Sequence, residues 1–176
     1  GENELKEVKS VLLTGKMNVQ GMALKYEQKQ MSPNMEVTDV VMNEKPVVHK
    51  VFNGTTGSTT QMGNKKDLSQ DEIAENIETK GIFTQVFYKE SGYKLNNTGI
   101  EKVGANEAYK INVTSPSGIK STEYYDVNSG YRVKVVRSSK DGGQDVQQSV
   151  EFSNYKKVGN KMFPFTANVS VESPAG

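Results

Sequence analysis

The sequence contains no cysteine, no tryptophan and a single histidine, His49. Without cysteine, a disulfide scaffold, a zinc ribbon and a thiol nucleophile are excluded. One histidine cannot supply the zinc-binding pattern His-x-x-Glu-His, because zinc sites need three or four ligands. No Gly-x-Ser-x-Gly pattern of a serine hydrolase is present either. The sequence therefore predicts a protein that is not an enzyme and holds neither metal nor cofactor.

The chain also lacks a strong net charge and a long apolar run. It has 22 lysines and arginines against 21 aspartates and glutamates, so it has no electrostatic reason to bind nucleic acid. No run approaches the roughly 18 apolar residues of a membrane span, and no signal peptide pattern occurs at the N-terminus. We expect any targeting segment to have preceded Gly1.

Alternating apolar and polar residues dominate what is present. Residues 10–173 are predicted to form a single β domain, between a tail or helix end at 1–9 and a tail at 174–176. In the first part we expect five strands, because turn residues separate alternating runs. The expected reversals are Gln20-Gly21, Ser32-Pro33-Asn34, Asn43–Pro46 and Asn53-Gly54.

The alternation stops at residue 68, and a helix is predicted at residues 69–80. Ser69 and Glu72 have the spacing of a capping box, and Leu68 with Ile73 has that of a hydrophobic staple. The next apolar residues, at 82–87, recur with a spacing that favours a second short helix over a strand. Their β-branched and aromatic side chains leave the strand as an alternative.

The second half reads as a meander of six strands with turn residues between them. Its clearest part is residues 119–139, where two alternating runs flank Asn128-Ser129-Gly130. Glu123 and Asp126, three apart on one strand, are expected to face opposite sides and so not to form an acid–base pair. The expected strands are 93–103, 107–115, 119–127, 131–139, 146–155 and 161–172.

The fold class that follows is mainly β. About eleven antiparallel strands must curl, and we expect an incomplete barrel with one or two helices over its open side. No segment of this pattern is a chemical motif. What the sequence says about function therefore depends on a resemblance.

Five segments carry a resemblance to a known family: Thr14–Met22, Val51–Gly54, Ser115–Gly118, Ser121–Asp126 and Phe163–Phe165. They resemble the LolA/LolB superfamily of periplasmic lipoprotein carriers. They are similar in particular to a LolA-like domain found at the C-terminus of insulinase-family zinc peptidases of Bacteroidetes and in free-standing outer membrane lipoprotein-sorting homologues. The resemblance implies an unclosed barrel, an apolar cavity for acyl chains, and a location in the periplasm or at the outer membrane.

The predicted function is binding of a lipid or acyl chain, with residues 69–88 as a cover that moves. Methionines suit an adaptable apolar surface, although they also simply fill cores. The alternative is an accessory interaction domain whose partner is a zinc peptidase domain. Peripheral association with a membrane stays open. The residues expected to line the ligand are Met17, Val19, Met22, Leu24, Met35, Val37, Ile73, Ile77, Phe83 and Phe87.

A local group of basic residues adds a smaller question. Arg132, Lys134, Arg137 and Lys140 lie close together in the sequence. A solvated face is the interpretation that the sequence favours for them, and contact with an anion or a lipid head group is the alternative.

Overall fold

The computed structural model describes residues 2–141 and 144–172. It divides the chain between Ser91 and Gly92 into two compact units, each built on one antiparallel sheet of six strands. Within each sheet, strands that are neighbours in sequence are neighbours in space. The short connections favour this arrangement. The fold is therefore two consecutive meanders.

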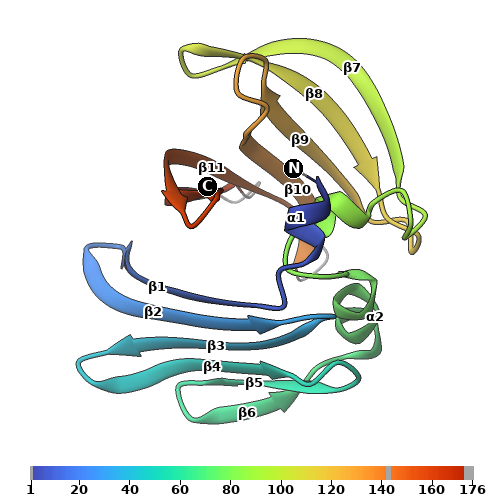
Figure 1. Ribbon diagram of the computed structural model, residues 1–176. Helices are drawn as coiled ribbons and strands as arrows, with labels where there is room; N and C mark the ends of the chain where they lie inside the picture. Colours follow the sequence, from blue (N-terminus) through green and yellow to red (C-terminus); the bar gives the residue numbers. More distant parts are fainter. Residues whose placement is uncertain (1, 142–143, 173–176) are drawn as a thin grey trace. The chain divides into compact units, whose positions relative to one another are not determined.

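The first sheet follows a short helix, α1 (Glu2–Lys6), and has the order β1-β2-β3-β4-β5-β6. Figure 1 shows its strands side by side, from dark blue β1 to green β6. The strands are β1 (Ser10–Val19), β2 (Met22–Met31), β3 (Met35–Met42), β4 (Lys45–Phe52), β5 (Gly57–Gln61) and β6 (Asn64–Asp67).

Tight turns with left-handed backbone conformations close its hairpins. Gln20 and Gly21 connect β1 to β2 with φ of 50° and 81°, and Asn43 and Glu44 connect β3 to β4 with φ of 47° and 65°. Two successive positive φ angles are what a type I′ turn requires. The predicted reversals at these positions are confirmed.

Helix α2 (Gln70–Glu78) confirms the capping box. The Glu72 backbone N–H donates to Ser69 Oγ over 3.3 Å, and the Ser69 backbone N–H donates to a Glu72 carboxylate oxygen over 2.8 Å. The hydrogen bond from the Ser69 backbone is the largest cause that lowers the pKa of the Glu72 carboxyl, followed by that from its hydroxyl. The 3-10 helix η1 (Thr84–Phe87) is the second short helix that the sequence favours at residues 82–87.

Helix α2 lies at one end of the first sheet, beside the turns that join β2 to β3 and β4 to β5 (Figure 1). Asn34 Nδ2 donates to the Asn76 carbonyl over 3.5 Å, and the Gly81 N–H donates to the Pro33 carbonyl over 2.6 Å. No residue of α2 itself is buried. The helix is therefore attached by few contacts.

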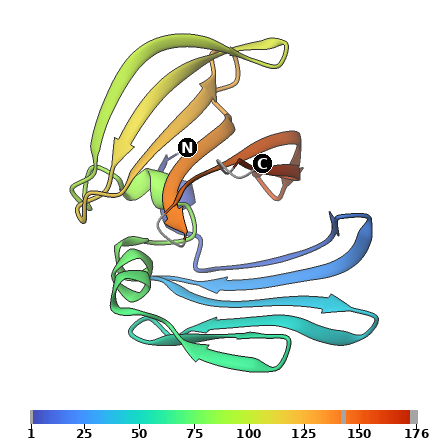
Figure 2. The same ribbon diagram turned by 180° about the vertical axis from the view of Figure 1, so that it is seen from behind.

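The second sheet has the order β12-β11-β10-β9-β8-β7, and Figure 2 shows it from behind. Residues 142–143 of the predicted turn between β10 and β11, and the predicted tail at 174–176, lie outside the described residues. The strands are β7 (Lys94–Val103), β8 (Asn106–Thr114), β9 (Lys120–Asp126), β10 (Arg132–Asp141), β11 (Gln144–Val158) and β12 (Lys161–Glu172).

The structure confirms a mainly β, antiparallel fold, with twelve strands where the sequence predicts about eleven. The missed strand is β6, Asn-Lys-Lys-Asp, whose four side chains are all exposed and polar. Such a strand has no apolar alternation for a sequence pattern to detect. Over the described ranges neither sheet closes on itself, since β1 and β6 are the edges of one and β7 and β12 those of the other.

Each unit has a small core of its own. In the first unit the buried apolar residues are Val40, Phe52, Leu68 and Tyr88. In the second they are Ala108, Val113 and Val135. The carboxylates of Glu123 and Asp126 are buried in the second unit as well. Asp126 accepts hydrogen bonds from Ser129 and Asn128 in the turn after β9, and the Ser129 side chain is the main cause that lowers its pKa.

Candidate functional site

The pairing of β1 with β2 places four of the predicted ligand residues on one face of the first sheet. Met17 lies opposite Leu24, and Val19 lies opposite Met22. Because side chains alternate along a strand, the other odd-numbered residues of β1 share this face. In β1 these are Val11, Leu13 and Gly15, so every position of β1 on this face is apolar or glycine. We call the five residues Val11, Leu13, Gly15, Met17 and Val19 the β1 stripe.

The β1 stripe is only partly covered. Val11 and Met17 are half-buried, whereas Leu13 and Val19 are exposed, as is Met22 on β2. The stripe runs the length of the strand, about 27 Å at the usual rise per residue. One of its ends is at the β1–β2 hairpin, and the other is near the β2–β3 turn to which α2 is attached, since the Ser32 N–H donates to the Lys9 carbonyl. The stripe offers an extended apolar surface.

The structure does not bring Met35 and Val37 to this face. In the β2–β3 register Tyr26 lies opposite Val40, so the even-numbered residues of β3 share the face of the β1 stripe. Met35 and Val37 therefore point to the opposite side, which also carries Lys29 and Asp39. The sequence shows which residues of β3 share a face, but it does not show which of the two faces of β3 lies on the same side of the sheet as the β1 stripe.

The predicted helical residues lie at the far end of the sheet from Met22. Ile73 lines a hollow beside β4–β6, and Ile77 is exposed. Phe83 and Phe87 are half-buried. The Phe87 ring packs so closely on Gly81 that a Cβ there would clash with it, and Lys6 Nζ lies 5.6 Å from the ring centre. Phe87 thus holds η1 against α1, and the ten predicted residues do not form one site.

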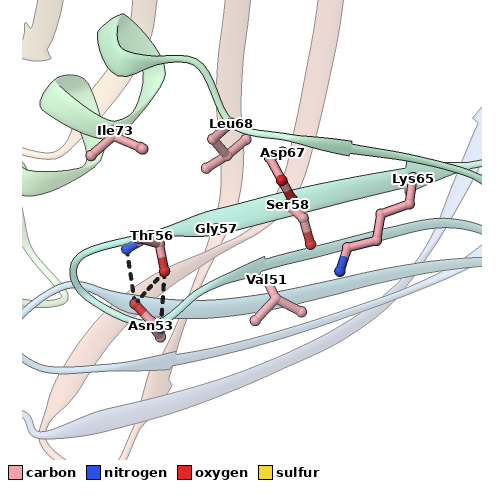
Figure 3. Close-up of a pocket in the computed structure, with 9 residues that line it drawn as sticks. All are labelled: Val51, Asn53, Thr56, Gly57, Ser58, Lys65, Asp67, Leu68 and Ile73. Carbon is pink, nitrogen blue, oxygen red and sulfur yellow. Dashed lines mark hydrogen bonds between the residues drawn. The ribbon is translucent and has the colours of Figure 1, made fainter.

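The hollow beside α2 is open and has a mixed lining (Figure 3). Its volume is about 380 Å³. Asn53 at its rim accepts hydrogen bonds from the backbone N–H groups of Thr55 and Thr56, which fixes the β4–β5 turn. A lining that mixes Lys65 and Asp67 with Leu68 suits a small polar molecule better than an acyl chain. The lining residues are Val51, Asn53, Thr56, Gly57, Ser58, Lys65, Asp67, Leu68 and Ile73.

A second hollow, of about 410 Å³, lies at the opposite end of the first sheet, by the β3–β4 and β5–β6 turns. Met42 and Met62 belong to its lining, and Met62 is highly exposed. The other lining residues are Asn43, Lys45, Pro46 and Val47.

The second sheet has one apolar and one polar face. Val135 of β10 lies opposite Glu123 of β9 and opposite Val150 of β11, so Glu123 is a carboxylate on the apolar face. It is 1% exposed. Glu123 accepts hydrogen bonds from the Tyr125 hydroxyl and from Arg132 Nη1, the latter over 3.4 Å. A buried charge is costly unless it is paired in this way.

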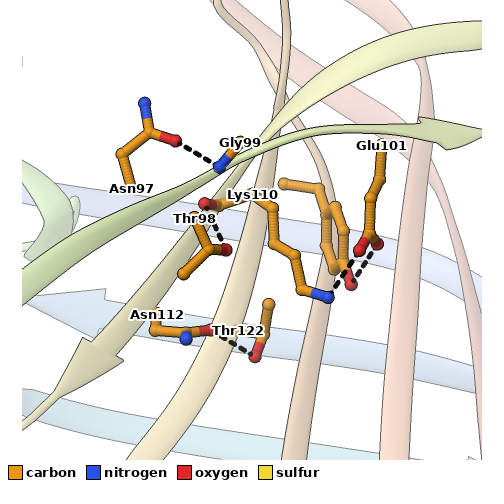
Figure 4. A network of polar contacts seen from close by, with 8 residues as sticks. Asn97, Thr98, Gly99, Glu101, Lys110, Asn112 and Thr122 are labelled. Atoms are coloured by element: carbon orange, nitrogen blue, oxygen red, sulfur yellow. Dashed lines mark hydrogen bonds and ion pairs between the residues drawn. The ribbon is translucent and has the colours of Figure 1, made fainter.

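The polar face carries a network of exposed side chains (Figure 4). Lys110 Nζ lies 2.6 Å from Glu101 Oε1, the Tyr124 hydroxyl donates to Glu101, and Thr122 donates to Asn112. Exposed ion pairs of this kind contribute little to stability. Around this network the face is a solvated surface.

The basic residues near 132 divide between the two faces. Arg137 shares the apolar face with Val135, whereas Lys134 lies on the polar face and forms an ion pair with Glu151 over 2.9 Å. The side chain of Lys140 is outside the described side chains. The group is therefore not a single basic patch.

Little in the described residues suits catalysis. His49 Nδ1 lies 2.7 Å from Asp39 Oδ1 on neighbouring strands, a partly exposed pair. Across residues 2–141 and 144–172, no group of three or more histidine, aspartate or glutamate side chains could hold a metal ion. In the same ranges, no helix has the length and apolar character needed to cross a membrane.

Sequence reasoning missed the role of Glu123 and Arg132. The available signal was the position of Glu123, which lies on the same face of its strand as Ile119 and Tyr125. That phase predicts its burial but not its partner. Arg132 reaches Glu123 because the register between β9 and β10 shifts between Arg132 and Lys134, and such an irregularity leaves no clear pattern in a sequence.

Comparison with solved structures identifies the fold. No protein-family model and no curated protein matches the sequence. The structure is similar to that of a putative outer membrane lipoprotein-sorting protein domain from Vibrio parahaemolyticus, with a TM-score of 0.59 and 12% identity over 99% of this chain and 90% of that one.

Two further structures are similar over nearly the whole chain. A DUF1329 family protein from Desulfovibrio piger has a TM-score of 0.62 and 12% identity, over 99% of this chain and 82% of that one. A LolA superfamily protein from Nitrosomonas europaea has a TM-score of 0.57 and 10% identity, over 98% and 83%. One of these neighbours is thus a protein of the LolA superfamily that the sequence resembles, and the likeness shows the fold.

Proposed function

We propose that the protein binds an acyl chain or a similar apolar lipid along the β1 stripe, and carries it in the periplasm or at the outer membrane. The observation that carries this proposal is the stripe itself. Five consecutive same-face positions are apolar or glycine, and three of them (Leu13, Gly15 and Val19), with Met22 beside them, are exposed. Exposed apolar surface of this extent is typical of a binding site.

The chemistry of the surface fits an acyl chain. Burying apolar surface contributes about 25 cal/mol per Å², without directional requirements. Methionine side chains such as Met17 and Met22 adapt their shape to a flexible ligand. The lipoprotein-sorting domain from Vibrio parahaemolyticus has a similar fold, which supports a ligand of this class. We propose no catalytic step, because the described residues include no arrangement suited to one.

The proposal is tested by native mass spectrometry of the protein purified from a lipid-containing host, followed by denaturing extraction. We expect a stoichiometric adduct that becomes a free lipid on denaturation. Leu13 and Leu12 offer a matched pair of variants, since both are exposed, at 39% and 59%, on opposite faces of β1. Leu13→Glu should abolish the adduct, and Leu12→Glu should keep it.

Two results would contradict the proposal. One is a protein without adduct that also fails to take up added fatty acid or phospholipid. The other is equal loss of the adduct in both leucine variants, which would show that the face of β1 does not matter.

The second candidate is an accessory interaction domain, with a zinc peptidase domain as its partner. The observation that favours it is the edge strand β12, where Phe165, Val169 and Val171 are exposed. An edge strand with apolar side chains can pair with a partner's strand. An adduct-free protein in the experiment above would favour this candidate.

A further inference from the structure

We propose that the apolar face of the second sheet carries an anion site centred on Arg132, and that its ligand is a single-chain amphiphile with an anionic head group. The inference goes beyond the proposed function, because it concerns a different sheet and the charged end of a ligand. It stands on the contacts among Glu123, Arg132 and Phe152.

Arg132 is held from two sides. Its Nη1 donates to the buried Glu123 carboxylate over 3.4 Å, and its guanidinium carbon lies 4.8 Å from the centre of the Phe152 ring. Its backbone carbonyl accepts a hydrogen bond from the Tyr155 hydroxyl over 2.6 Å, and the Tyr155 ring stacks on Tyr131 at 4.6 Å. These contacts fix the guanidinium before any ligand arrives, which reduces the entropy lost on binding.

The guanidinium keeps donors for a ligand. An arginine has five N–H donors, and within the described part of the chain the side chain of Arg132 makes one hydrogen bond, the one to Glu123. The Arg132 side chain is 29% exposed. The planar fork of donors matches a carboxylate or phosphate. An anion can therefore approach a group that is already oriented.

A purely structural role accounts poorly for this pair. Buried ion pairs can often be replaced by well-packed apolar residues without loss of stability. The neighbours of Glu123 on this face include Val135 and Ile111, which a further apolar side chain would match. A guanidinium that a buried carboxylate already orients, and that is itself partly exposed, is suited to binding an anion.

The surface beyond Phe152 suits the tail of the ligand. Phe152 of β11 lies opposite Ala167 of β12, and Val150 lies opposite Val169. Val169 and Val171 are exposed on the edge strand. From Arg132 an alkyl chain can thus lie across β11 and β12 on Phe152, Val150, Ala167 and Val169. This juxtaposition favours an anionic amphiphile over a free anion.

The test compares three ligands with a ten-carbon chain on the full protein by isothermal titration calorimetry at neutral pH: decanoate, 1-decanol and decyltrimethylammonium. We expect decanoate to bind at least about tenfold more tightly than the other two, the order of one charge-assisted hydrogen bond. Equal affinity for decanoate and 1-decanol would overturn the inference. If acetate or inorganic phosphate bound as tightly as decanoate, the alkyl chain would contribute nothing to binding, and the inference that the ligand is an amphiphile would be wrong.

Single substitutions test whether Arg132 causes the preference for decanoate. Arg132→Gln should remove it, and Arg132→Lys should retain only part of it, because lysine keeps the charge without the fork. Arg137→Gln is the matched control, an exposed arginine on the same face of β10, and should leave the preference intact. Retention of the preference in Arg132→Gln would overturn the inference, as would its loss in Arg137→Gln.

Folding is controlled with a double variant. Arg132→Gln removes the cation that donates to the buried Glu123 carboxylate, so we expect the melting temperature of that variant to fall for a reason unrelated to the ligand. Glu123→Gln/Arg132→Gln removes both charges and keeps two side chains that can hydrogen-bond each other. We expect the folded double variant to bind 1-decanol like the native protein and to show no preference for decanoate. A retained preference in this variant contradicts the anion site.

Discussion

Ser69 and Glu72 stabilise the start of α2 by reciprocal hydrogen bonds, and a single substitution tests their contribution. Ser69→Ala removes the acceptor for the Glu72 N–H. A lost N-cap typically costs about 1 kcal/mol. Because no residue of α2 is buried, we expect this loss to appear as local opening of residues 70–78, measured by hydrogen exchange, with little change in the amides of β3 and β4.

The same pair makes α2 sensitive to acid. Since folding lowers the pKa of Glu72, its contribution is fully present above the ordinary glutamate pKa of about 4.3 and is lost as the pH falls through the lowered value. The 13C chemical shifts of α2 should report this loss. Glu72→Gln should remove the pH dependence and Glu75→Gln should preserve it; the opposite pattern would contradict the assignment.

Single residues also show how far the candidate site could be predicted. Alternation correctly grouped Met17 with Val19, and Met22 with Leu24, since each pair lies within one strand. It could not relate β3 to β1, and Met35 and Val37 lie on the other face. Which residues share a face depends on the register between strands, and one residue of shift reverses every side chain.

At the scale of elements, the two parts of the predicted cover differ in how firmly they are held. Helix α2 is attached mainly by the Asn34–Asn76 hydrogen bond and the packing at Leu68. In contrast, η1 is held by the contact of Phe87 with Gly81 and Lys6. If residues 69–88 move to admit a ligand, α2 is the part that the contacts leave free to do so.

A cross-link tests this movement. The chain has no cysteine, so Asn34→Cys/Asn76→Cys introduces one defined pair between the β2–β3 turn and α2. We expect oxidation to slow the uptake and release of a fluorescent fatty acid several-fold, with an unchanged Kd, because a closed gate affects both rates equally. The reduced protein is the control. If the uptake and release rates were unchanged after complete oxidation, movement of α2 would not control access of the ligand.

The elements themselves were largely predictable. The capping box located α2 because it depends on residues three apart, and turn residues located most hairpins. β6 was missed because its residues are all polar, and β11 runs from Gln144 to Val158, longer than the predicted 146–155. Local patterns thus determine where a strand begins better than how far pairing with a neighbour extends it.

At the scale of the whole molecule, the topology follows from connection length. Every sheet pairing joins strands adjacent in sequence, which short turns make the natural outcome. Pairing between strands that are far apart in the sequence would not have been indicated by short turns. The Glu123–Arg132 contact depends on a register shift between two strands, and it could therefore not be predicted from the sequence.

The charge of the whole molecule leads to the last prediction. With 22 basic and 21 acidic residues, the protein has no strong field to steer it toward a charged membrane. The rate at which it takes up pyrene-labelled phospholipid from vesicles containing anionic lipid should change less than about twofold between 0.01 and 0.1 M salt, although the Debye length falls from about 30 to about 10 Å.

A more basic variant supplies the control for this rate. Replacing four exposed acids by their amides raises the formal net charge from +1 to +5, and uptake from the same vesicles should then become faster at low salt and fall as salt is added. A steep salt dependence in the native protein would instead indicate a local basic surface that docks on the membrane. The four replacements are Glu7→Gln, Glu44→Gln, Asp71→Asn and Glu75→Gln.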